Sequence, residues 1–139
     1  MPKGTLAPET WATAHERFEA FGPTAQSVVR EVAKAMEFDR EEYDDRVTSD
    51  VVETARQAMF AEELAVRVDD AEAFEAWRAE TAHDVHVVGH EAADRVAWHD
   101  APAASRAVAA TFGSEPEAAV ATVRRMAFNC LYREELCDP

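Results

Sequence analysis

The chain contains no isoleucine, four leucines, two lysines and two cysteines among its 139 residues. Two cysteines are too few for the disulfide framework of a small secreted domain, so we expect a cytoplasmic location. No apolar run approaches the length of about 18 residues that a membrane-spanning helix needs, and Met1 to Leu6 lack the apolar stretch of a signal peptide. These absences argue against a secreted or membrane-anchored protein.

Glycine is scarce as well, and the motifs of several enzyme classes are missing. The four glycines are scattered at Gly4, Gly22, Gly89 and Gly113, so they form no GxxxxGK[ST] or GxGxxG loop that would cradle phosphate. No serine stands in the GxSxG motif of the α/β-hydrolases, and no spacing matches HExxH or a Cys/His zinc finger. The sequence therefore indicates no catalytic residue.

Lysine scarcity accompanies a strong acidic excess. Asp and Glu outnumber Lys and Arg by 28 to 14, which gives a formal net charge of -14 at pH 7, and both halves of the chain share the excess. In multimolar salt the Debye length falls to about 3 Å or less, so repulsion between surface carboxylates costs little. We therefore expect a halophilic protein, with an acidic mesophilic protein as the alternative. In a halophile, net charge alone does not exclude a nucleic-acid partner.

The first part of the chain has the apolar spacing of helices. A helix is predicted from Pro8 to Phe21, where Gly22-Pro23 would end it. A second helix is predicted over 24–37, with apolar residues gathered on one face. That face consists of Ala25, Val28, Val29, Val32 and Met36. Asp39 is expected to cap a short acidic helix, and Ser49 a further one.

The middle of the chain alternates apolar and polar residues, as strands do. Strands are predicted over 64–68, 85–87, 96–98 and 106–112, with a short helix over 69–77 and a turn at Gly89. Ser114 is expected to cap a long final helix. Strands clustered between helices predict a single α+β domain over residues 1–139. We expect N-terminal helices, a small, mainly antiparallel sheet of about four strands and a long C-terminal helix.

Histidines concentrate in the strand region, at His83, His86, His90 and His99. If the strands on either side of Gly89 pair, His86 and His99 would face each other on the outer surface of the sheet, with Asp84 nearby. Two imidazoles and a carboxylate form a ligand set for Zn²⁺ or Fe²⁺. The sequence thus offers His86, His99 and Asp84 as metal-ligand candidates, and a solvated sheet face is the alternative interpretation. No other cofactor is predicted.

The final helix carries an apolar stripe that includes Cys130, which we expect to be buried. It also carries the most basic local patch, formed by Arg124, Arg125 and Arg133. These arginines would contact nucleic acid or a partner's carboxylates, or would pair with acidic neighbours such as Glu117 and Glu135 on the same helix. Intrahelical pairing is the expectation that we prefer.

Several short segments resemble a haloarchaeal protein family of unknown function. The similar segments are Ala7–Thr10, Gly22-Pro23, Val28–Val32, Phe38–Asp45, Phe74–Trp77, Arg95–His99 and the closing helix. The resemblance covers most of the chain, and it implies a halophilic habitat and single-domain extent. It implies no activity, because none of these segments is a catalytic motif.

Two function classes follow from these observations. The first is a non-enzymatic protein-interaction or regulatory domain, which would form a homodimer or bind a protein partner through its alanine-rich final helix. The alternative is a small metal-binding protein or metal-dependent enzyme that uses the His83–His99 region. A nucleic-acid-binding accessory protein is the second alternative, and a membrane partner is not expected.

Overall fold

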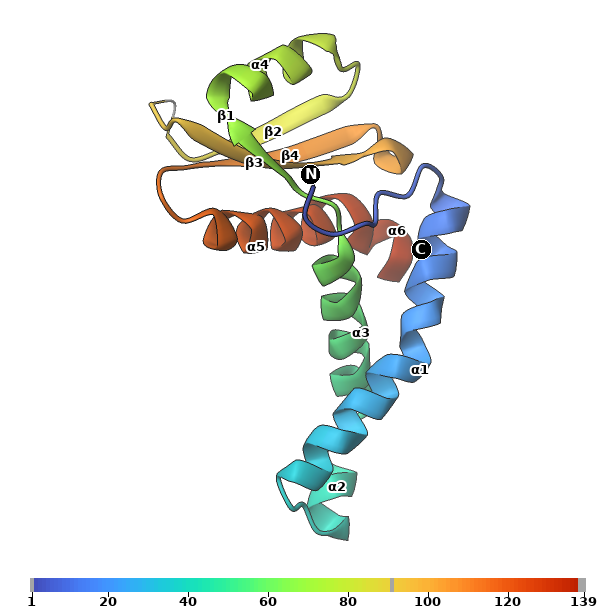
Figure 1. Cartoon of the computed structure of the whole chain (residues 1–139). Coiled ribbons are helices and arrows are strands. Elements are labelled where there is room, and N and C mark those ends of the chain that lie inside the picture. The colour runs from blue at the N-terminus through green and yellow to red at the C-terminus, as the bar shows by residue number, and fades with distance from the viewer. Residues whose placement is uncertain (1, 91, 138–139) are drawn as a thin grey trace.

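The computed structural model describes residues 2–90 and 92–137 of the chain, shown in Figure 1. The helices are α1 (Trp11–Ala35), α2 (Arg40–Arg46), α3 (Ser49–Glu63), α4 (Ala71–Glu80), α5 (Pro116–Ala127) and α6 (Arg133–Cys137). The strands are β1 (Arg67–Asp70), β2 (Asp84–Val88), β3 (Arg95–Ala101) and β4 (Arg106–Phe112). The predicted α+β class is confirmed, with N-terminal helices, a mixed but mostly antiparallel four-strand sheet and a C-terminal helix of 22 residues.

The sheet has the strand order β1-β3-β4-β2. β3 pairs antiparallel with both β1 and β4, whereas β2 pairs in parallel with β4. The pairing considered from the sequence, between β2 and β3 around Gly89, is therefore not formed. β4 takes the place beside β3 because its residues 107–110 are all apolar and buried. β2 carries exposed polar residues at alternate positions, so it fits the edge of the sheet.

Helices cover both faces of this sheet. On one face, the α4 side chain Phe74 packs on Trp98 with ring centroids 5.1 Å apart, and Trp77 lies at 5.7 Å from the same ring. The opposite face packs against the C-terminal helix, whose Val120 and Val123 join the larger hydrophobic core. Because side chains alternate along a strand, Trp98 and its neighbour His99 project to opposite faces. Trp98 itself is buried, with 3% of its surface exposed.

One long helix replaces the two helices predicted on either side of Gly22-Pro23. α1 begins after a Thr10 cap and runs through Pro23 to Ala35. Glycine before proline has no Cβ to clash with the proline ring, which makes the helical conformation accessible. Tertiary contacts then hold the junction together. The guanidinium of Arg56 on α3 lies 4.1 Å from the Phe18 ring centroid and pairs with Glu19 at 3.7 Å.

The predicted helix caps are only partly correct. Asp39 caps α2 as expected, since its carboxylate accepts from the Glu42 amide at 2.8 Å. The cap of α3 is Thr48, one residue before the predicted Ser49. Ser114 caps nothing, because α5 begins with Pro116 after Glu115 and no side chain bonds its first turn. Proline in the first turn has no amide hydrogen, which removes one of the donors that a cap would satisfy.

A π-helical turn at Phe128–Tyr132 interrupts the C-terminal helix. A π turn holds one residue more than an α turn, so it rotates every later side chain relative to the preceding stripe. Leu131 and Tyr132 consequently enter the core, and Cys130 is exposed. The prediction that Cys130 belongs to the buried stripe is wrong for this reason.

The lower part of Figure 1 is a helical arm, which we define as residues 22–58. It comprises the second half of α1, all of α2 and the first part of α3. In Figure 1 the arm projects away from the sheet and its covering helices. None of the α2 residues is buried, so the tip of the arm has no core of its own.

Candidate functional site

His99 is the most deeply buried of the predicted site residues, with 0% of its surface exposed. Its Nδ1 lies 2.7 Å from the Ala65 carbonyl oxygen, and its Nε2 lies 2.7 Å from the Tyr132 hydroxyl oxygen. A carbonyl can only accept, so Nδ1 must donate to Ala65. Neutral His99 then accepts the Tyr132 hydroxyl proton at Nε2. Both nitrogens are satisfied inside the protein, which explains how a polar ring is tolerated in the core.

Burial shifts both groups of this pair toward their neutral forms. Desolvation lowers the pKa of His99, against the opposing influence of the Ala65 hydrogen bond and the Asp100 charge. Desolvation raises the pKa of Tyr132, and the Asp100 charge acts in the same direction. An imidazole and a phenol that are neutral, buried and bonded to each other act as a structural link between β3 and the C-terminal helix.

His86 and His99 do not face each other as the sequence suggested. Val108 on β4 pairs with both, so the two histidines lie on strands two positions apart. Two strand spacings amount to about 10 Å. The face that they share is also not the outer surface, since the C-terminal helix covers His99. Asp84 and His86 stay exposed on the edge strand β2.

The predicted metal-ligand set is therefore not assembled. In residues 2–90 and 92–137, no group of three or more His, Cys, Asp or Glu side chains is placed to hold a metal ion. Metal binding by His86, His99 and Asp84 stays a prediction, and it would require a conformation different from this one. His83 instead forms a close pair with Asp100, with Nδ1 and Oδ1 at 2.7 Å.

Arg124 of the C-terminal helix is held by another part of the chain, whereas Arg133 is held within the helix. The Arg124 guanidinium contacts the Leu64 carbonyl oxygen at 3.1 Å and pairs with Glu62 of α3 at 3.6 Å. Arg133 bonds the Asn129 side-chain oxygen. Glu135 lies 3.5 Å from His15 of α1. The predicted pairing of Arg124 and its neighbours with Glu117 and Glu135 is wrong, because α3 and α1 pack against this helix and supply nearer partners.

The final helix is also not the open interface that we expected. Its apolar face is buried against the sheet and the other helices of the same chain. The buried residues of α5 are Ala119, Val120, Val123 and Ala127. A partner cannot use this face without opening the core.

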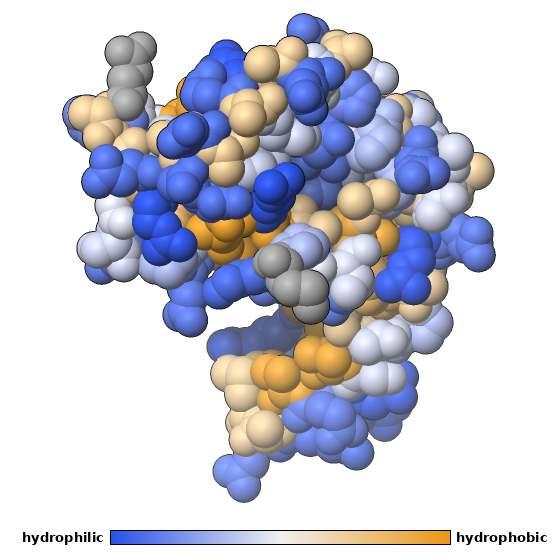
Figure 2. Space-filling view, turned by 45° about the horizontal axis from the view of Figure 1, so that its top comes forward, coloured by the Kyte–Doolittle hydropathy of each residue, from blue (hydrophilic) through white to orange (hydrophobic). Residues whose placement is uncertain are grey.

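An exposed apolar stripe lies instead on the arm. Val28 and Val32 of α1 and its C-cap residue Met36 expose 44%, 51% and 58% of their surface. Figure 2 shows apolar surface gathered on part of the lower lobe, which is the arm, among hydrophilic residues. We call Val28, Val32 and Met36 the arm stripe. The sequence predicted an apolar face on this segment, and these three of its side chains are exposed in the structure.

The arm stripe is continuous and lacks charge. Its residues are spaced by four, which places them one above the other on a single helix face. At 100° per residue, Arg30 and Lys34 point about 160° away from Val32. Lys34 is engaged with Glu31 at 3.6 Å on the solvent side. On the same segment Ala25 and Ala33 are buried, so α3 covers only part of a wide apolar face.

Sequence reasoning missed two features of this arrangement. The link between His99 and Tyr132 joins residues 33 positions apart, and no local pattern reports such a pair. The arm stripe was visible as an apolar pattern, but the pattern does not say whether a helix of the same chain covers it. Both features depend on which elements pack together.

Comparisons with known proteins identify the family of this chain, but they indicate no activity. Within the described residues, no helix has the length and apolar character needed to cross a membrane. No curated protein and no solved structure shows a significant similarity to the chain. A family model matches residues 5–133, which is nearly the whole chain. The resemblance to a family of unknown function is thus confirmed, while its haloarchaeal range stays a prediction. The chain belongs to DUF5809, a family of unknown function.

Proposed function

We propose that this chain is a protein-interaction domain that forms a homodimer through its arm stripe. The observation that supports the proposal is the exposure of Val28, Val32 and Met36 at 44%, 51% and 58% on one helix face. Three adjacent apolar side chains in water are unfavourable, and contiguous apolar surface of this kind marks interaction sites. Their projection on an arm leaves them accessible to another molecule (Figure 1).

A second copy of the chain fits this stripe by symmetry. In a two-fold dimer the same surface meets itself, so residue i contacts j while j contacts i. If two α1 helices lie antiparallel with the axis at Val32, Val28 meets the partner's Met36 and Val32 meets the partner's Val32. The contacts among these side chains are then apolar, and Arg30 and Lys34 point away from the axis.

The proposed dimer should depend on the salt concentration. Each copy carries a formal net charge of -14, so two copies repel one another at low ionic strength. Salt at molar concentration screens this repulsion and strengthens apolar association. We infer that the protein works in a salt-rich cytoplasm, where the arm stripe associates. The dimer should dissociate when KCl is lowered.

The test compares two glutamate substitutions on α1. Val32→Glu places two carboxylates at the proposed axis, and Ser27→Glu adds the same charge about 140° away on the exposed side. We expect sedimentation equilibrium in multimolar KCl to show a dimer for the wild type and Ser27→Glu, and a monomer for Val32→Glu. A monomeric wild type, or a Val32→Glu protein that still dimerises, would contradict the proposal.

A further inference from the structure

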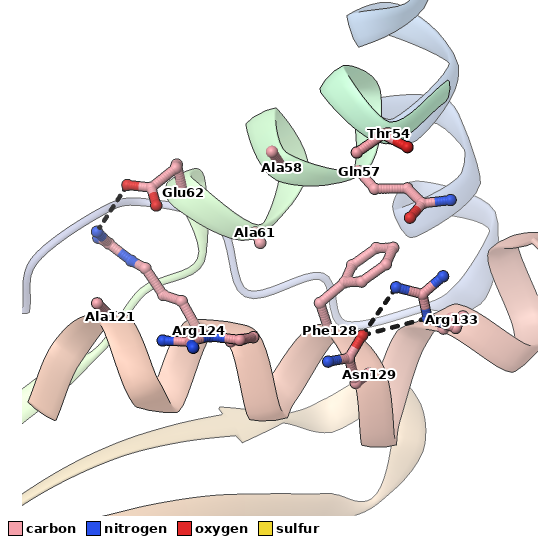
Figure 3. Close-up of a pocket in the computed structure, with 11 residues that line it drawn as sticks. Thr54, Gln57, Ala58, Ala61, Glu62, Ala121, Arg124, Phe128, Asn129 and Arg133 are labelled. Atoms are coloured by element: carbon pink, nitrogen blue, oxygen red, sulfur yellow. Dashed lines mark hydrogen bonds and ion pairs between the residues drawn. The ribbon is translucent and has the colours of Figure 1, made fainter. Parts of the chain in front are cut away.

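A groove between α3 and α5 differs in charge from the rest of the molecule. It has a volume of about 330 Å³ and is shown in Figure 3. Alanines of both helices and Phe128 form its apolar floor, and polar side chains stand around the rim. This size is at the low end of the range for small-molecule sites, about 300–1,000 Å³.

Positive charge collects at this rim. Arg124, Arg125 and Arg133 line the groove, whereas Glu62 is the only acidic lining residue among those that the structure describes. The groove thus has an excess of two positive charges in a chain whose formal net charge is -14. In a protein with twice as many acidic as basic residues, three arginines around one hollow are an unusual concentration.

The three arginines are held differently. Arg124 is fixed by the Leu64 carbonyl and Glu62. Arg133 uses Nε and Nη2 on the Asn129 oxygen, at 3.2 and 2.8 Å, and its guanidinium lies 5.1 Å from the Phe128 ring centroid. Its Nη1 forms no hydrogen bond to any part of the chain that the structure describes. Figure 3 shows Arg133 and Asn129 joined beside the Phe128 ring.

Arg125 supplies the accessible charge. It is exposed, and no carboxylate lies within ion-pair distance of it in the described ranges. Guanidinium groups are planar and can donate two parallel hydrogen bonds to the oxygens of one carboxylate or phosphate. These paired bonds are stronger and more specific in geometry than a single contact. Arg133 is oriented by Asn129 and Phe128, so less side-chain entropy is lost when an anion binds.

We propose that this groove binds a small organic anion. Its carboxylate or phosphate group would contact Arg125 and Arg133, and a short apolar or aromatic body would rest on the floor at Phe128. The apolar floor distinguishes this ligand from a free inorganic ion, which would gain nothing from that surface. The inference is independent of the proposed dimer, because the arm stripe contributes no residue to the groove.

The experiment titrates the whole protein with three probes in molar KCl and follows heat or amide NMR shifts. The probes are phenyl phosphate, benzoate and inorganic phosphate. We expect saturable binding of phenyl phosphate or benzoate, at least several-fold tighter than inorganic phosphate. The stronger of the two organic probes identifies the anionic group. Absence of saturable binding by both organic probes would overturn the proposal.

Variants locate the binding. Arg125→Gln and Arg133→Gln should each weaken the organic probe about tenfold, which is the usual loss of one charge-assisted contact. Ala121→Phe should also weaken it, by filling the groove without changing charge. Arg30→Gln on the arm is the matched control and should bind as the wild type does. Arg125 is exposed, so Arg125→Gln tests the site even if another variant fails to fold. Unchanged binding in both Arg125→Gln and Ala121→Phe would place the probe elsewhere and reject the inference.

Discussion

The sheet body and the helical arm are built from the same limited set of apolar residues, but they bury them to different degrees. In the body, Val96, Val108 and Val123 have at most 1% of their surface exposed. In the arm, Val28 and Val32 expose 44% and 51%. The body is layered, with a helix on each face of the sheet, whereas the arm consists of parts of α1 and α3 with α2 at its tip and has no sheet (Figure 1). An apolar helix face therefore indicates a need for a partner, and the tertiary structure decides whether that partner is in the same chain.

The junction between the two regions is aromatic. Phe60 is 0% exposed and lies 5.7, 5.9 and 5.3 Å from the ring centroids of Phe18, Phe128 and Tyr132. These rings come from α1, α3 and the π-helical turn. The arm is thus anchored to the body at one cluster, and the comparison predicts large effects there and small effects at the tip.

The largest effect is expected for Phe60→Ala. Loss of a fully buried ring removes its apolar burial and leaves a cavity, at a cost of about 3–5 kcal/mol in the free energy of unfolding. Urea unfolding in molar KCl, followed by tryptophan fluorescence, measures this change. The control is Val51→Ala on α3, where 42% of the side chain is exposed and little change is expected. Equal losses in both variants would remove the distinction between junction and arm.

A pH effect of intermediate size is expected in the body. The folded pKa of His99 is lower than its unfolded value of 6.5, so the unfolded chain binds more protons as the pH falls below that value. Protonation of His99 should therefore not affect the free energy of unfolding above pH 6.5. Below pH 6.5 the free energy of unfolding should decrease by roughly 1 kcal/mol per pH unit. The pKa of Tyr132 is raised above its unfolded value of 10.0, so the free energy of unfolding should also decrease as the pH rises above 10.0.

The variant His99→Gln sharpens this measurement, because glutamine keeps a donor and an acceptor but does not titrate. Its unfolding free energy should depend less on pH between 5 and 7 than that of the wild type. The other four histidines remain in both proteins, so their contribution cancels in the difference. The same slope in both proteins would show that His99 does not cause the loss.

The smallest effect is expected for Val32→Ala in the monomer. The side chain loses few contacts there, and alanine has the higher helix propensity, so the free energy of unfolding should stay within about 0.5 kcal/mol of the wild type. Val123→Ala in the body is the contrast and should cost about 2 kcal/mol, since two buried carbons and their packing are lost. Urea unfolding, measured at protein concentrations low enough for the protein to be monomeric, checks the predictions for both variants. A large loss in Val32→Ala would mean that the arm stripe is covered within the chain.

Much of the fold could be predicted from the local pattern. Alternation of apolar and polar residues located β2 and most of β3, because side chains that alternate between a core and its opposite face leave a period of two, and a short apolar run located β4. The Asp39 cap was readable for a similar reason, since a carboxylate and the amide three residues on interact locally. Charge and lysine scarcity suggested a salt-rich habitat, which stays a prediction.

The candidate site followed from the sequence much less well. His86 and His99 were correctly placed on strands, but β4 separates them, and strand order is a non-local property. Arg124 was expected to pair within its helix, yet Glu62 of another helix is its partner.

By itself, then, the sequence determined the class of fold and the position of most elements, since these depend on interactions between residues close along the chain. Only the tertiary structure decided that Gly22-Pro23 lies inside a helix, that His99 is buried against Tyr132 and that the arm stripe faces solvent. Each of these three outcomes depends on which surface packs against which. That choice is made by the free energy of the whole assembled core, to which no single segment contributes enough to settle it.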